Sequence, residues 1–276
     1  MSSRIATCNP LKTTIAKPAA ALLALAWLCI PGRLAARENV YDVLGKALGP
    51  IANVFAVDDS GQPGVHALVL DAHLLTASKL PPQLQGQAIH VAIQTPDAIL
   101  VQAPIAGQKL TVCRDGDALW ATPGSNVEPL LRQALASASP GKKKKKHKNE
   151  EAAILGPLAV PVTQKEMVFL PVLFQATDAG DETVAGNQCM VMDVELMPQM
   201  EKSMHAEGWT AKLWVGPDYG IVQIALMGPD WTGTAAIDKL DFPAGLPDAT
   251  FQPQGTDVLK LTAEQFLRLI GAVGRE

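Results

Sequence analysis

The sequence predicts a mainly β protein with some helices, built on antiparallel strands, and three observations lead to this fold class. The segment Gly107–Thr122 is typical of a β-hairpin, because side-chain character alternates in its first arm and Asp115-Gly116 tolerates the positive φ of a primed turn. In the second half of the chain, turns between strands are shorter than the roughly dozen residues of a parallel crossover. Several strands are also apolar on both faces, so other elements must cover the sheet.

The first 36 residues are predicted to be a signal peptide. Arg4, Lys12 and Lys17 precede the apolar run Ala19–Ile30, and the small-residue site Leu34-Ala35-Ala36 follows it. The run is too short to cross a bilayer. We therefore expect export to the periplasm with cleavage after Ala36. The alternative is that the run is retained as an N-terminal membrane anchor.

Length and charge limit the function classes. The chain has 276 residues, of which 48% are apolar, and this suits one large or two small domains. The full chain carries a formal charge of −4, and the signal peptide holds four basic and no acidic residues, so the mature chain carries −8. Such a charge argues against general nucleic-acid binding, which needs a basic face to displace counterions.

Cysteine usage argues against a disulfide scaffold. Cys8 and Cys29 leave with the signal peptide, so only Cys113 and Cys189 remain. Each of these two lies within a predicted strand, and several strands at about 4.8 Å spacing separate them. We therefore expect them not to be bonded to each other.

The first half of the chain begins with a helix and continues as a meander of strands. Apolar residues at near-helical spacing over Glu38–Val57 predict one amphipathic helix or, with a break near Gly49, two. Alternation predicts a strand over His66–Ala77. His90–Gln102 is predicted to be an antiparallel partner with a turn or bulge at its proline, so three strands meander in sequence order. An apolar stripe then predicts a helix over Val127–Ala138.

The second half returns to strands, which are expected at Glu166–Gln175, Gly186–Leu196, Thr210–Val215, Gly220–Met227 and Gly233–Phe242. Asp178–Asp181 is predicted to turn between the first pair, and Gly216–Asp218 between the third and the fourth. Helices are expected over Pro198–Glu207 and Thr262–Val273, the second with a capping box from Thr262 to Gln265. These helices can bury one face of the sheet or fill a half-closed barrel.

The order of elements and several short motifs resemble the LolA-type family of periplasmic lipoprotein carriers and LolA-like lipoprotein-sorting proteins. The matching segments are Thr95–Leu100, Val112–Gly116, Ala118–Trp120, Val184–Cys189, Ala211–Val215, Gly220-Ile221 and Leu246–Pro253. The resemblance implies one LolA-like domain over residues 37–276, an unclosed antiparallel β-barrel wrapped around a few helices. It also implies an apolar cavity for the acyl chains of lipoproteins. One departure is that the family's arginine before the motif proline is Thr95 here.

We expect the concave face of this half-barrel to bind a long apolar ligand. Methionines such as Met190 and Met192 are flexible and polarizable and suit a cavity for variable chains. The same methionines would also pack an ordinary core. The candidate ligand-binding residues are Leu68, Leu70, Ile99, Val101, Trp120, Phe169, Met190, Met192, Trp214 and Ile224.

A lysine-rich block interrupts the chain at residues 139–151, where we expect a solvated, mobile loop. The alternative is that the block contacts an anionic membrane surface or an acidic partner. The residues of that contact would be Lys142, Lys143, Lys144, Lys145, Lys146 and Lys148.

The sequence shows no catalytic motif, and we expect neither an enzyme, nor a cofactor, nor a metal site. The five histidines are spread along the chain, and there is no nucleophile elbow or Gly-rich phosphate loop. Three hypotheses are carried forward: a monomeric carrier or chaperone for lipid or lipoprotein acyl chains, an envelope sensor that binds a protein partner, and a hydrolase using the same cavity. The third is the minority interpretation.

Overall fold

The computed structural model describes residues 37–78, 85–105, 108–137, 155–204, 206–229 and 231–272. The predicted signal peptide, residues 1–36, lies outside the described residues, as does the lysine-rich block. Asn39–Glu276 forms one compact unit, which is described below.

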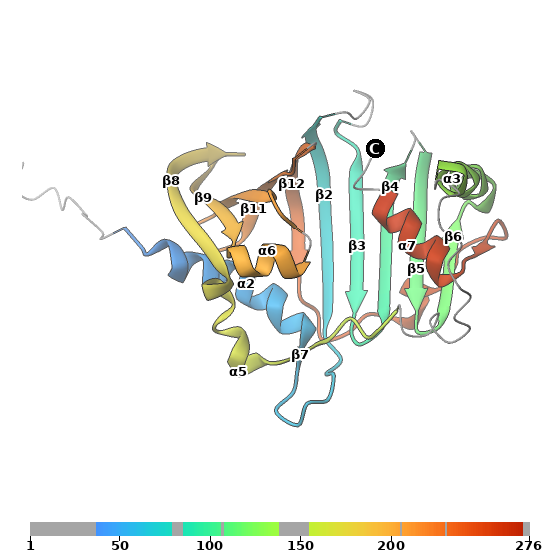
Figure 1. Cartoon of the computed structure of the whole chain (residues 1–276), viewed down its shortest axis with the longest axis horizontal. Helices are drawn as coiled ribbons and strands as arrows, with labels where there is room; N and C mark the ends of the chain where they lie inside the picture. The colour runs from blue at the N-terminus through green and yellow to red at the C-terminus, as the bar shows by residue number, and fades with distance from the viewer. Residues whose placement is uncertain are drawn as a thin grey trace, which may run out of the picture. The chain divides into compact units, whose positions relative to one another are not determined.

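The main feature of this unit is an 11-stranded sheet in which every neighbouring pair is antiparallel (Figure 1). The two outermost strands do not pair with each other, so the sheet stays open, and the predicted fold class is confirmed. In spatial order the strands are β13 (Leu259–Lys260), β6 (Ala118–Thr122), β5 (Gln108–Asp115), β4 (Ala98–Ile105), β3 (Ala88–Gln94), β2 (Ala67–Ala77), β12 (Thr232–Asp241), β11 (Ile221–Met227), β10 (Thr210–Val215), β9 (Asn187–Leu196) and β8 (Phe174–Val184). A second, two-stranded sheet pairs β1 (Ala56–Val57) with β7 (Val160–Thr163) in parallel.

The hairpin at Asp115-Gly116 is confirmed, with Gly116 at φ 57°. The predicted meander of three strands is wrong in number, because β3, β4, β5 and β6 make four. Thr95-Pro96-Asp97 is the turn between β3 and β4, where a residue without an N–H group breaks the ladder.

The helices of the described residues are α2 (Val40–Phe55), α3 (Gly124–Ser137), α5 (Gln164–Met167), α6 (Pro198–Met204) and α7 (Ala263–Ala272), with the 3₁₀ turns η2 (Leu170–Leu173) and η3 (Asp248–Phe251). The N-cap of α2 is Asn39, whose side chain accepts a hydrogen bond from the Tyr41 amide at 2.9 Å. The capping box of α7 is confirmed, since Thr262 and Gln265 each accept from the other's backbone N–H.

Helix α2 is continuous through Pro50, so the break that the sequence suggested near Gly49 does not occur. A proline inside a helix removes one backbone hydrogen bond. Buried residues lie on both sides of it, Leu44 and Ala47 before and Ala52 and Val54 after, so both parts of the helix pack against the rest of the protein.

The strand predicted over Glu166–Gln175 is wrong. The Thr163 side chain and Glu166 form a capping box that starts α5, and Pro171, which cannot donate to a ladder, lies in η2. Strand β8 begins only at Phe174 and runs through Asp178–Asp181, with a bulge between Asp178 and Gly180 in place of the predicted turn. The turn to β9 is at Ala185-Gly186, both with positive φ.

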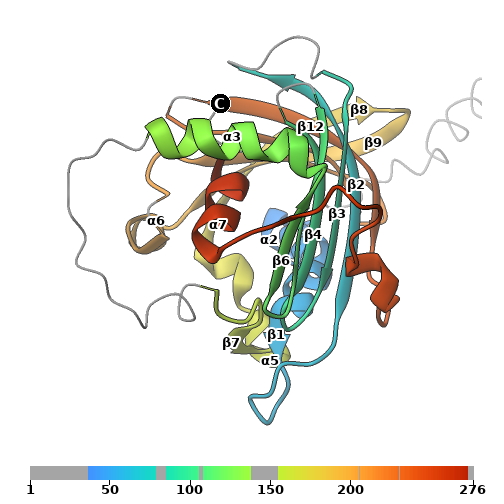
Figure 2. The same ribbon diagram turned by 90° about the vertical axis from the view of Figure 1, so that its right-hand side faces the viewer.

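Residues that face each other across neighbouring antiparallel strands lie on one face of the sheet. Two buried clusters occupy the same face, which we call the inner face. In the first, Leu44 of α2 packs on Met192 and Leu213 of β9 and β10. In the second, Val127 of α3 and Phe266 of α7 pack on strands β5 and β6. Figure 2 shows α2, α3 and α7 on one side of the sheet.

The opposite face, the outer face, carries two smaller clusters. Phe251 of η3 packs near Trp120 and Cys113, and Trp214 covers Cys189 and Val191. Cys113 and Cys189 are both free and buried, and strands β4, β3, β2, β12, β11 and β10 lie between theirs. The prediction that they are not bonded to each other is confirmed.

The edge strand β8 is protected against pairing with another chain. Three of its N–H groups donate outside the ladder: Phe174 to the Pro171 carbonyl, Ala176 to the Tyr41 hydroxyl at 3.4 Å, and Gly180 to the Asp178 carboxylate at 2.8 Å. A bulge and side-chain acceptors are ways in which sheet edges avoid aggregation.

Candidate functional site

The centre of the inner face is apolar and only partly covered. Leu70, Val91 and Val101 pair in register across β2, β3 and β4, and Leu68, Ile93 and Ile99 form the adjacent row. Leu70, Val91, Ile93 and Val101 are half-buried, and none of them belongs to the buried clusters of the described residues. The two helical covers therefore leave apolar strand surface between them.

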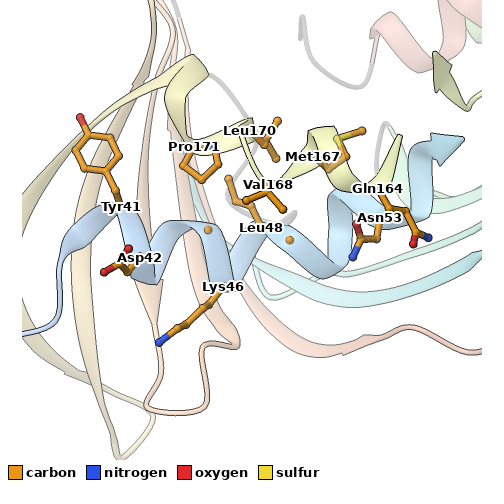
Figure 3. A pocket seen from close by; sticks show the side chains of 12 residues that line it. Tyr41, Asp42, Lys46, Leu48, Asn53, Gln164, Met167, Val168, Leu170 and Pro171 are labelled. Carbon is orange, nitrogen blue, oxygen red and sulfur yellow. The ribbon is translucent and has the colours of Figure 1, made fainter. Parts of the chain in front are cut away.

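A groove of about 550 Å³ lies between α2 and the α5–η2 segment (Figure 3). Its volume falls within the roughly 300–1,000 Å³ of ordinary ligand sites. Helix α2 packs on the inner face and α5–η2 packs on α2, so the groove is on the same side of the sheet as the apolar rows. Its lining is mixed, and comprises Tyr41, Asp42, Gly45, Lys46, Leu48, Gly49, Asn53, Gln164, Met167, Val168, Leu170 and Pro171.

Two glycines of α2 shape this groove in different ways. A Cβ atom at Gly45 would lie 3.2 Å from the Pro171 side chain, so the absence of a side chain there lets η2 approach the helix. A Cβ atom at Gly49 would meet nothing within 4 Å, so this position opens the floor of the groove. In Figure 3, Asn53 and Gln164 lie beside each other at one end of the groove.

The α5–η2 segment also presents an apolar surface to solvent, which we call the apolar ridge: Val168, Phe169 and Val172. Their exposed fractions are 74%, 68% and 65%. Their neighbours Met167, Leu170 and Pro171 line the groove instead. The segment is thus apolar toward the groove and toward solvent, and an exposed apolar patch of this kind marks a site of interaction.

The structure brings most of the sequence-predicted ligand residues to one face. Seven of them lie on the inner face according to the strand register: Leu68, Leu70, Ile99, Val101, Met190, Met192 and Ile224. Met192 is fully buried under α2 and is part of a closed core.

The remaining three do not lie on the inner face. Trp120 and Trp214 are on the outer face, where their indole N–H groups donate to the Phe251 carbonyl at 3.1 Å and to Glu182 at 2.8 Å. Phe169 is not on a strand at all, because it belongs to the apolar ridge. The expectation that the two tryptophans border the cavity is therefore wrong.

Arg114 is the residue of this region that the sequence interpretation missed. It lies on the inner face of β5, in register with Ile99 and Leu119, and is 7% exposed. Its Nε donates to the Gly116 carbonyl at 3.2 Å, Nη1 to Gly156 at 2.8 Å and Nη2 to Leu155 at 3.1 Å. The signal that points to it is a charged residue in the alternating series of Leu110 and Val112, two positions after Val112.

Thr95, at the position that matches an arginine in the LolA-type family, has a structural role. It is buried, its hydroxyl donates to the Gly64 carbonyl at 2.8 Å, and it accepts from the His66 amide at 3.0 Å. It therefore ties the start of β2 to the β3–β4 turn.

The described residues include no group of three His, Cys, Asp or Glu side chains that could hold a metal ion. Nor does any helix among them reach the length and apolar character needed to cross a membrane.

No family model and no curated protein matches the chain. Among solved structures, it is similar to lipoprotein LppX of Mycobacterium tuberculosis, with 10% identity and a TM-score of 0.36 over 73% of this chain and 94% of that one. It is similar to the MucA/MucB complex of Pseudomonas aeruginosa, with 12% identity and a TM-score of 0.38 over 82% of this chain and 64% of that one. It is also similar to a LolA superfamily protein of Nitrosomonas europaea, with 9% identity and a TM-score of 0.28 over 78% of this chain and 98% of that one.

Proposed function

We propose that this protein is an exported, non-enzymatic envelope protein that holds an apolar chain on the inner side of its open half-barrel, as a carrier or chaperone. The observation that supports this most directly is the half-buried apolar surface of β2, β3 and β4 between two separate cores. In a closed core these residues would be fully buried. A bound apolar chain of variable length would instead cover the part of their surface that is still exposed, and this burial would favour binding. The groove beside α2, with its mixed lining, lies on the same side of the sheet.

Binding is tested with delipidated protein and laurate, by calorimetry and native mass spectrometry. We expect saturable binding in the micromolar range, about −8 kcal/mol. Leu70→Trp fills the inner face and should weaken binding at least tenfold. Val69→Trp is the matched control, because Val69 is the adjacent half-buried residue on the outer face and should leave binding unchanged. Absence of saturable binding by the wild type, together with a loss of stability in Leu70→Trp, would mean that the interior is solid core.

A second candidate function is an envelope sensor that binds a protein partner. The apolar ridge favours it, since three largely exposed apolar side chains on one short segment suit a protein contact. The two roles differ in coupling. A sensor changes its affinity for a partner when the apolar ligand binds, and a carrier transfers the ligand to an acceptor without forming a lasting complex.

A further inference from the structure

Arg114 is the only charged residue on the inner face of strands β2 to β6 within the described residues. All the hydrogen-bond acceptors that it has among the described residues are backbone carbonyls, and no carboxylate pairs with it. A buried cation without an anion is costly, because neutral carbonyls only partly replace its hydration. Among the described residues, the guanidinium thus lies in an apolar surface without a carboxylate in hydrogen-bond contact.

The guanidinium also has unused capacity for hydrogen bonding. Arginine carries five N–H donors in a planar fork, and three of them bind the carbonyls of Gly116, Leu155 and Gly156. Charge-assisted hydrogen bonds to a carboxylate or phosphate are about twice as strong as hydrogen bonds between neutral groups. An anion at this point would therefore bind the Arg114 guanidinium more strongly than the backbone carbonyls do.

The surroundings provide a path for an apolar chain attached to such an anion. From Arg114 the inner-face row continues through Ile99, Ile93 and Leu68, one residue per strand. At about 4.8 Å between strands, this row is about 14 Å long. We propose that Arg114 binds the anionic head group of the apolar ligand, a carboxylate or a phosphate, while the chain lies along this row. The inference rests on the proposed function, and names the class of its ligand as anionic amphiphiles.

Access to Arg114 has a consequence for the neighbouring backbone. Because the side chain is 7% exposed, a head group reaches it only when the Leu155–Gly156 backbone moves aside. Leu155 also packs against the α3–α7 cluster. Anion binding should therefore loosen residues 155–156, whereas binding of a neutral chain should not.

The test compares four amphiphiles with the same twelve-carbon chain, below their micelle concentrations: dodecyl phosphate, laurate, dodecanol and dodecyltrimethylammonium. For the wild type we expect the two anions to bind at least tenfold more tightly than dodecanol, and the cation to bind most weakly. Arg114→Gln should lose this preference and keep the affinity for dodecanol. Arg132→Gln is the charge-matched control, because Arg132 lies exposed on α3 beside Glu128 and should keep the preference.

Hydrogen exchange of the wild type gives a readout that does not depend on how well the variant folds. Dodecyl phosphate, but not dodecanol, should increase exchange at the N–H of Leu158, which donates to the Pro96 carbonyl and lies two residues after Gly156. Equal affinity of the wild type for the anions and dodecanol, or unchanged exchange with the anion, would overturn the inference and leave Arg114 as a backbone anchor. Failure of all four amphiphiles to bind would instead count against the proposed function itself.

Discussion

Gly45 and Gly49 are one helical turn apart on α2, yet their substitution should have different effects. A Gly→Ala change inside a helix stabilises by about 0.5–1 kcal/mol, and Gly49→Ala should show part of this gain, because apart from its chain neighbours the new Cβ meets nothing within 4 Å and only the ring of Pro50 crowds it. Gly45→Ala should gain less or destabilise, since the new Cβ would lie 3.2 Å from Pro171. Urea denaturation of the two variants measures the difference. Equal gains would show that η2 does not press on α2.

The two buried thiols give a prediction in alkaline solution. Burial, and secondly the negative charge of Asp115, raises the pKa of the Cys113 thiol to about 12, and burial raises the pKa of Cys189. The unfolded chain therefore ionises first as the pH rises above the ordinary value of 9.0. The stability contributed by the neutral buried thiols is present below that pH and is lost as the pH rises toward 12.

The measurement is a thiol titration with a disulfide reagent at pH 8. The native protein should react slowly, and the unfolded, unreduced mature protein should show both thiols. A total of four, the count of the full chain, would show that the signal peptide is retained. Rapid reaction in the native state would contradict the burial on which the pKa argument depends.

At the scale of single residues, sequence alternation predicts which side chains share a face but not which face is covered. Trp120 of β6 is in register with Cys113 of β5, and both pack toward η3, which follows β6 by more than a hundred residues in the chain. Nothing local in β6 distinguishes this face from the other. Arg114 was missed for the related reason that two of its three carbonyl partners, Leu155 and Gly156, lie beyond the lysine-rich block in the chain.

At the scale of elements, the strands and helices with strong periodicity could be predicted from the sequence, and the α5–η2 segment could not. Met167–Phe174 is apolar throughout, so its composition fits a buried strand as well as two short turns. The Thr163–Glu166 capping box and the position of Pro171 decide in favour of the turns. The groove depends on this segment, and for that reason the sequence could not reveal it.

The edge strand β8 gives an element-scale prediction. Tyr41→Phe removes the hydroxyl that accepts from the Ala176 N–H, and a single exposed hydrogen bond of this kind contributes about 0.5 kcal/mol. Stability should therefore change little, while self-association should increase because an edge donor is exposed. Sedimentation velocity over a range of concentrations measures this. Identical profiles for the variant and the wild type would show that the bulge alone protects the edge.

At the scale of the whole molecule, the two inner-face cores should respond separately to damage. Leu44→Ala and Phe266→Ala each remove a buried side chain and should cost about 2–5 kcal/mol. Hydrogen exchange should accelerate most in β9 and β10 for the first variant, and in β5 and β6 for the second, because the buried strand residues of each cluster lie on those strands. Equal acceleration across the sheet in both variants would show a single cooperative unit.

The lysine-rich block should be dispensable for folding. Helix α3 ends at Ser137, and Arg114 ties the chain again at Leu155 and Gly156, so the intervening residues are held at both ends. Replacement of residues 141–149 by a short Gly-Ser linker should leave the melting temperature within a few degrees of the wild type. Loss of binding to anionic vesicles in this variant would identify the block as a membrane contact.

The placement of the helical covers has a consequence for the order of synthesis. The first helix of the described chain, α2, covers a core on β9 and β10, which are made late, and α7 covers a core on β5 and β6, which are made early. A ribosome therefore releases β2 to β6 long before Phe266 exists to complete their packing. The nascent first half therefore lacks part of its core until residues 263–272 emerge, and this delay would keep it unfolded for the export proposed above.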